Sequence, residues 1–221
     1  MYKTETHLHT AQGSRCGKLT AADMVARYKA AGYTTVFITD HFQKTHVDER
    51  GETWNERIQS FLSGYRAAKA AGDEIGLTVL LGAEFGFVKH PNHYLVYGFD
   101  EQFLIEEGER ALAMDPADFL PEAKERGFLV VQAHPFRDGK CVPKPEWVDG
   151  FEVHNTNPRH ENFDDQCEAV AAEHGLLCIG GSDAHRPEDV AGTGVVSDTP
   201  IASVTDFIAA VRSGAAKPLF Q

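Results

Sequence analysis

The stretch from Thr20 to His41, TAADMVARYKAAGYTTVFITDH, predicts one helix followed by one buried strand. Thr20 can cap the start of the helix, and Gly32 is a typical residue at its end. The run TTVFIT is β-branched and largely apolar, which is typical of a strand that is covered on both faces. Asp40 and His41 follow immediately, so polar side chains stand at the carboxyl end of a buried strand.

The same alternation of helical and strand patterns extends along the chain. We expect helices over 54–72, 115–127, 161–175 and 203–214, and strands over 77–87, 93–99, 128–134, 149–155, 176–185 and 192–197. Alternating strands and helices predict a mainly parallel sheet with helices outside it. About seven such units favour an α/β chain forming a closed or nearly closed barrel in a single domain over 1–221. A doubly wound open sheet is the alternative.

Composition narrows the range of functions. The chain has 221 residues and a formal net charge of −12, which disfavours non-specific binding to nucleic acid or to an anionic membrane. We see no apolar run that resembles a signal peptide or a membrane span. The four cysteines form no C-x-x-C pair, so free thiols in a reducing cytoplasm are expected.

Histidines and carboxylates cluster at the predicted strand ends. His7 and His9, like Asp183 and His185, are two residues apart, so each pair points to one side of an extended chain. Closure of a barrel would bring the two pairs together at the rim that usually carries the active site. The full set of candidate metal ligands is His7, His9, His41, Glu84, His93, His134, Asp183 and His185.

These residue types predict a multinuclear metal site. Imidazoles and carboxylates without a set of thiolates suit zinc, manganese or iron, and they are too many for one tetrahedral ion. Glu84 could bridge two ions. The expected nucleophile is a metal-bound hydroxide, so no Ser or Cys nucleophile is required. We expect Asp40 to take a catalytic role by orienting an imidazole or a water.

Five motifs in order resemble the PHP family, the polymerase and histidinol phosphatase domain. They are HLHT, TDH, GAE, AHPF and GSDAH, and the resemblance runs from Met1 to about Ser197. It implies a distorted (β/α)7 barrel that holds up to three divalent metals and hydrolyses phosphate esters. The implied ligands are His7, His9, Glu84 and Asp183 for one metal, Glu84, His93 and His134 for the second, and His41 and His185 for part of the third.

The chain departs from this family at one place. Many members carry an Asp or His shortly after the H-x-H pair as a further ligand of the third metal, whereas this chain reads TAQGSRCGK. Cys16 could substitute as a thiolate, water could fill the place, or the third ion could bind weakly. The sequence leaves these alternatives open, so two to three divalent ions are expected.

A phosphate substrate also requires cations. Arg137 immediately follows the AHPF motif, and Arg159 with His160 follows the strand predicted over 149–155. Guanidinium groups clamp phosphate in a fork, so we assign Arg137 to catalysis and substrate binding, and Arg159 and His160 to substrate binding.

The function expected from the sequence is a phosphomonoesterase that acts on a small phosphorylated metabolite, with no membrane partner. A nuclease or nucleotide phosphodiesterase is the alternative. It would need a basic channel or a stacking platform, to which Phe42, Trp54, Phe136 and Trp147 could contribute. A non-catalytic metal-binding module and a C–N hydrolase are the remaining possibilities.

Overall fold

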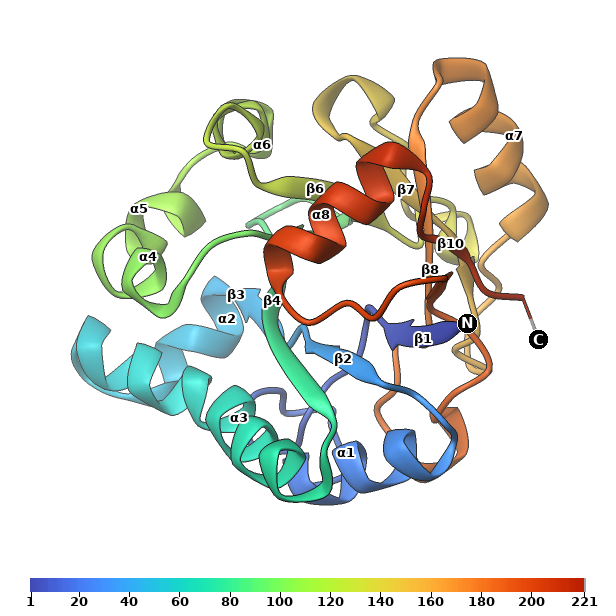
Figure 1. Ribbon diagram of the computed structural model, residues 1–221. Coiled ribbons are helices and arrows are strands. Elements are labelled where there is room, and N and C mark those ends of the chain that lie inside the picture. The colour runs from blue at the N-terminus through green and yellow to red at the C-terminus, as the bar shows by residue number, and fades with distance from the viewer. Residues whose placement is uncertain (221) are drawn as a thin grey trace.

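The computed structural model describes residues 1–220, which form a mixed α/β fold around one sheet (Figure 1). The strand order is β10-β9-β1-β2-β4-β5-β6-β7-β8, and β3 pairs with β4. The sheet curves into a nearly closed barrel with helices around it, which confirms the predicted fold class. The strands are β1 Tyr2–Glu5, β2 Thr35–Ile38, β3 His41–Gln43, β4 Thr78–Gly86, β5 His93–Tyr97, β6 Leu129–Ala133, β7 Gly150–Asn155, β8 Leu177–Gly181, β9 Val195–Ser197 and β10 Lys217–Pro218.

The helices have clear local signals. Thr20 caps α1, and Thr53 and Glu56 form a capping box at the start of α3. Helix α6 begins at Pro116 and continues through Pro121. The α-helices are α1 Ala21–Ala30, α2 Lys44–Val47, α3 Trp54–Ile75, α4 Glu101–Glu106, α5 Gly108–Ala113, α6 Pro116–Glu125, α7 Asp164–His174 and α8 Val204–Ser213. Of these, α2, α4 and α5 are additions to the elements that the sequence patterns predicted.

The sheet departs from a regular parallel barrel at β5, β9 and β10. Strand β5 runs antiparallel to both β4 and β6, and β9 runs antiparallel to β1 and β10. Helix α8 closes the end of the barrel at which β2, β4 and β6 begin, because Phe207 packs against Phe37 and Tyr97 with ring centroids 4.6 and 5.0 Å apart. The opposite end, where the parallel strands finish, is therefore the open one.

The two ends of the sheet meet just beyond β1 and β8. Leu8 and Ala184 form a parallel bridge, and the amide of His9 donates to the carbonyl of Ala184 at 2.9 Å. Glu5 joins the same two segments, because its Oε1 accepts hydrogen bonds from the amides of His7 and Ser182 at 2.8 and 3.0 Å. Closure therefore places the H-x-H pair beside the GSDAH motif.

Glu5 makes the stability of the metal-free protein depend on pH. Burial raises the pKa of this carboxyl from 4.5 to about 7, despite the amide hydrogen bonds that lower it. Its contribution is fully present below pH 4.5 and is lost as the pH rises through 7, because the folded state then has to give up a proton that it holds better than the unfolded chain does. We expect this loss to be about 3 kcal/mol.

Chemical denaturation of the chelator-treated protein and of Glu5→Gln at pH 4.5 and pH 8 measures this effect. The variant cannot ionise at this position. The free energy of unfolding of the variant minus that of the native chain should therefore increase by that amount from pH 4.5 to pH 8. A difference that is independent of pH would show that Glu5 is ionised in the fold.

Candidate metal centre

The candidate ligands all lie at the open end of the barrel. His7 and His9 follow β1, His134 follows β6, and Asp183 with His185 follows β8. Strand β5 runs in the reverse direction, and its first residue, His93, pairs with Gly86 at the end of β4. The start of an antiparallel strand lies at the same rim as the ends of its parallel neighbours, which explains how His93 reaches this site.

Glu84 in β4 is the centre of the group and is completely buried. Its Oε1 lies 2.9 Å from Nδ1 of His93 and 3.1 Å from Nε2 of His134. Its Oε2 contacts Nδ1 of His41 and lies 3.6 Å from Nε2 of His9. One carboxylate therefore faces several imidazoles that arrive from separate segments: His7, His9, His41, His93 and His134.

His7, His9 and Asp183 form a second close contact beside Glu84. The Nε2 atoms of His7 and His9 are 3.1 Å apart, and Oδ1 of Asp183 lies 3.4 and 3.0 Å from them. Two imidazole nitrogens can face each other at this distance only if one of them lacks a proton. A cation shared by these lone pairs would satisfy both rings and the carboxylate.

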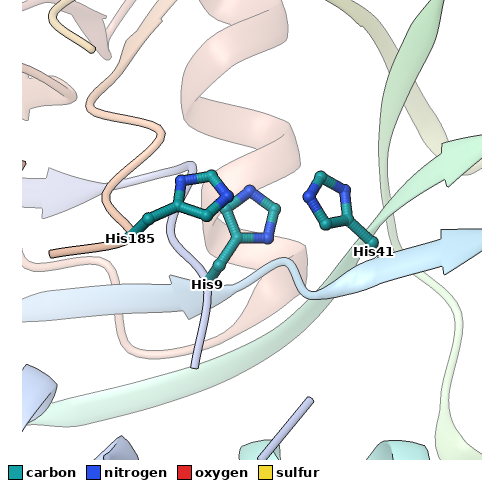
Figure 2. A group of neighbouring side chains, drawn as sticks. All are labelled: His9, His41 and His185. Atoms are coloured by element: carbon teal, nitrogen blue, oxygen red, sulfur yellow. The ribbon is translucent and has the colours of Figure 1, made fainter. Parts of the chain in front are cut away.

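A third group consists of His9, His41 and His185 (Figure 2). The ring of His9 stacks between the other two, with centroids 4.2 Å from each. Cys16 lines the same cavity as His41 and His185. Burial alone would raise the pKa of its thiol, but the interactions with these two imidazoles outweigh burial and lower the pKa to about 6.

The donor set fits divalent metal ions. Three overlapping groups have one ligand atom per residue within 4.8 Å of the others: His9, His41 and His185; His7, His9 and Glu84; and His41, Glu84 and His93. Among the described residues, Glu84 Oε2 and His134 Nδ1 are buried without a hydrogen-bond partner, a costly state that a bound cation would relieve at the carboxylate. Imidazole and carboxylate ligands suit zinc, manganese and iron.

The charge states of Glu84 and His9 favour cation binding. Burial would raise the pKa of Glu84, but the neighbouring imidazoles of His93, His41 and His7 hold it well below its usual range. Burial lowers the pKa of His9 well below its ordinary value, and the charges of His41 and His185 lower it further. An ionised carboxylate and a neutral imidazole are the forms that ligate metals.

Glu152 in β7 supports two of the candidate ligands, and the sequence motifs did not identify it. Its Oε1 lies 2.8 Å from Nδ1 of His7, and its Oε2 accepts from the amide of His134 at 2.9 Å. Gly181 permits this approach, since a Cβ there would stand 2.3 Å from Oε1 of Glu152 and 2.6 Å from Cβ of His7. The signal was available, because Glu152 interrupts the apolar strand FEV much as Glu84 interrupts LLGAEF.

The backbone is strained at two candidate ligands. His134 and Asp183 adopt φ values of 34° and 50°, in the left-handed region that non-glycine residues rarely occupy. Both residues directly follow buried strands, and such strain is commonly found where function requires a particular side-chain direction.

Asp40 acts on the loop that follows the H-x-H pair. Its Oδ1 accepts from the amide of Thr10 and the hydroxyl of Ser14, both at 2.7 Å. The hydroxyl of Ser14 in turn lies 3.2 Å from Nδ1 of His9 and accepts from the amide of His41 at 3.0 Å. Asp40 therefore reaches the imidazoles through Ser14, which makes it a positioning residue.

The metal-ligand group opens into a cavity of about 450 Å³ that also contains the residues expected to bind phosphate. Arg137 forms an ion pair with Oδ2 of Asp183 at 2.7 Å and donates to Oδ1 of Asn155 at 3.1 Å. Arg159 makes a two-pronged pair with Asp189 at 2.6 and 2.7 Å. His160 places Nδ1 2.9 Å from Asp138, and all three residues line the cavity. Further cations from Lys140 and Arg186 line it as well.

Comparison with known protein families agrees with this geometry. The model of the PHP domain matches residues 5–176. This chain belongs to the PHP domain family. A second model, described as PHP-associated, matches residues 163–216, which contain Asp183 and His185. The resemblance carried by the five sequence motifs is thereby confirmed.

Solved structures share the PHP-like fold at low identity. A two-domain protein from Bacteroides vulgatus that contains a predicted PHP-like metal-dependent phosphoesterase has a TM-score of 0.71 and 17% identity, and the match covers all of this chain but 65% of that one. PsfC from Pseudomonas syringae has a TM-score of 0.70 and 20% identity, with coverage of 100% and 91%. An amidohydrolase from Chromobacterium violaceum with bound sulfate has a TM-score of 0.58 and 17% identity, with coverage of 94% and 96%.

None of the curated proteins compared with the chain matches it. Among the helices of residues 1–220, none combines the length and apolar character needed to cross a membrane.

Proposed function

We propose that this PHP-family protein is a metal-dependent phosphomonoesterase that acts on a small phosphorylated metabolite. The main support is that one cavity joins the metal-ligand group to a set of cations. His41, His134 and Asp183 line one part of the cavity, and Arg137, Arg159 and Lys140 line the rest. A volume of about 450 Å³ is in the range of small-molecule sites.

The wall of the cavity favours this function over a nuclease or nucleotide phosphodiesterase. Within the described part of the chain, the lining residues include no Phe, Tyr or Trp on which bases could stack. Phe42 is buried in the core, and the indole of Trp54 donates to the carbonyls of Leu104 and Ile105. Phe136 and Trp147 also pack against the core. The acidic net charge of −12 disfavours a polyanionic substrate as well.

Metal ions would be held by the eight candidate ligands. Divalent ions polarise phosphoryl oxygens and make water a nucleophile at neutral pH. Glu84 would contribute both of its carboxylate oxygens to holding metal, because Oε2 faces His41 and Oε1 faces His93. Glu152 keeps the ring of His7 in one orientation, so that Nε2 faces the shared group.

The cationic residues would bind the phosphate and its leaving group. Arg137 lies between Asp183 and the cavity, where its guanidinium can orient a phosphoryl group next to the ligands. Arg159 is held at the cavity wall by the buried carboxylate of Asp189, which binds both of its terminal nitrogens. His160 is oriented by Asp138 and can donate a proton to a leaving alkoxide.

The test compares p-nitrophenyl phosphate, bis-p-nitrophenyl phosphate and a short oligonucleotide with the metal-replete protein. We expect the monoester to be hydrolysed the fastest. A panel of phosphorylated metabolites would then identify the class of substrate. Faster hydrolysis of the diester would favour the phosphodiesterase. Cleavage of amides alone would indicate a C–N hydrolase, and bound metal without turnover would indicate a binding module.

Arg137 should be the most important cation. We expect Arg137→Ala to lower kcat/KM for the preferred monoester about 100-fold, which corresponds to about 2.7 kcal/mol of transition-state stabilisation. Arg137→Lys should retain only part of the native kcat/KM, because an ammonium cannot reproduce the simultaneous contacts of the guanidinium with Asp183, Asn155 and Asn162. Steady-state kinetics measure both variants. Arg186→Gln is the matched control, and a loss as large in this control would mean that the cavity recognises only total charge.

A further inference from the structure

The loop from Thr10 to Leu19 occupies the place at which this chain departs from the usual PHP sequence. It contains no Asp or His, and its one cysteine is Cys16, in the run GSRCGK. The loop is fixed by backbone hydrogen bonds. The amide of Ala11 donates to Leu19 at 2.8 Å, and the amide of Gly17 donates to Ser14 at 3.1 Å. Cys16 is therefore held in a defined turn.

The same loop is tied directly to a candidate ligand. The amide of Lys18 donates to the carbonyl of His185 at 2.7 Å, two residues beyond Cys16. Gly17 packs so closely that a Cβ would stand 2.5 Å from the carbonyl oxygen of Thr10. Arg50 donates to the carbonyl oxygens of Gln12 and Gly13 from the other side. These contacts hold Cys16 at the wall of the cavity that His41 and His185 also line.

A second observation at this place is independent of the cysteine. Oε2 of Glu84 is completely buried, has no hydrogen-bond partner among the described residues and contacts His41. His41 and His185 also belong, with His9, to a group whose ligand atoms lie within 4.8 Å of one another. A buried carboxylate oxygen without a hydrogen-bond donor and a cluster of imidazole nitrogens are both typical of a cation site, and Cys16 lines the cavity beside His41 and His185.

We propose that Cys16 is a thiolate ligand of the third metal ion, together with His41 and His185, and that this site binds zinc in preference to manganese. The inference rests on the metal centre of the proposed function. A thiolate is a soft ligand that selects zinc, whereas a carboxylate suits manganese. The substitution would therefore give this member of the family a distinct metal preference at one of its sites.

Cobalt titration of the metal-free protein tests the ligation directly. Cobalt bound to a thiolate gives a charge-transfer band in the near ultraviolet. We expect this band in the native chain and in Cys141→Ser, and its loss in Cys16→Ser. Cys141 is the matched control because it lines the same cavity and its thiol faces the carbonyl of Pro91. A native chain without the band, or a Cys16→Ser variant that keeps it, would overturn the proposal.

Metal competition tests the preference. Elemental analysis after equilibration with equal zinc and manganese should show that Cys16→Ser loses one equivalent of zinc, while Cys16→Asp shifts the zinc-to-manganese ratio at that site at least about 10-fold toward manganese. Unchanged metal content in both variants would contradict the inference. Cys16 lies on a partly exposed loop, so the melting temperatures of the variants in chelator should match that of the native chain.

These readouts do not depend on turnover. A protein that shows the cobalt band but hydrolyses no phosphate ester would overturn the proposed function and support the Cys16 ligand. A protein that hydrolyses monoesters but lacks the cobalt band would support the proposed function and overturn the Cys16 ligand.

Discussion

Replacing Glu84 with glutamine should lower kcat/KM for phosphate monoesters at least about 1,000-fold, equivalent to about 4 kcal/mol. The side chain keeps its size, but it loses the negative charge that faces five imidazoles and the ability to bridge two ions. The amide group would also direct N–H donors at His41 or His93, where a cation is expected. Steady-state kinetics and elemental analysis measure the two effects, and we expect activity and bound metal to fall together.

The control is Glu109→Gln, which makes the same chemical change at an exposed position on α5. It should leave both activity and metal content unchanged. Glu84→Gln should still fold, because neighbouring His9 and His134 are held by Ser14 and Glu152 as well. If Glu84→Gln retained metal and near-native turnover, Glu84 would not be a ligand.

The second large effect is the response to metal removal. Chelation should abolish hydrolysis and lower the melting temperature, because it leaves the carboxylates of Glu84 and Asp183 in a buried group without the ions that would neutralise them. An ion present at 100 times its dissociation constant stabilises the fold by about 2.7 kcal/mol. For a chain of this size the corresponding shift in melting temperature is roughly 5–11 °C.

Scanning calorimetry with and without chelator, followed by addition of zinc, manganese or iron, measures this shift. The ion that restores both the melting temperature and the activity is the functional one. His9→Ala and Asp183→Ala should respond less to added ion than the native chain, and each should abolish turnover with little loss of fold. A native chain whose melting temperature is the same in chelator and in excess ion would argue against a metal centre.

Much of the fold could be predicted from local patterns. The β-branched run before Asp40, the cap at Thr20 and the spacing of apolar residues in 54–72 each depend on neighbouring residues alone. The direction of β5 could not be predicted, because HYLVYGF has the same pattern whether it runs parallel or antiparallel. The short helices α2, α4 and α5 could not be predicted either, because they are too short to show a periodic signal.

The candidate site shows the same division. The motifs HLHT and GSDAH nominate residues that the structure places within hydrogen-bonding distance, although 174 positions separate His9 from Asp183. The motifs did not reveal Glu152, whose role depends on the close approach that Gly181 permits. They also left Asp40 facing an unspecified partner, whereas the structure directs it to Thr10 and Ser14.

The amino-acid sequence by itself determined the alternation of strands and helices, the membership of a metal-binding family and the residues able to ligate metal, because these depend on residue type and on spacing along the chain. Only the tertiary structure decided which oxygen of Glu84 faces which imidazole, that Arg159 is held by Asp189, and that Cys16 lies against His41 and His185. Those contacts join segments that are distant in sequence, and their geometry follows from barrel closure and from the loops that closure brings together.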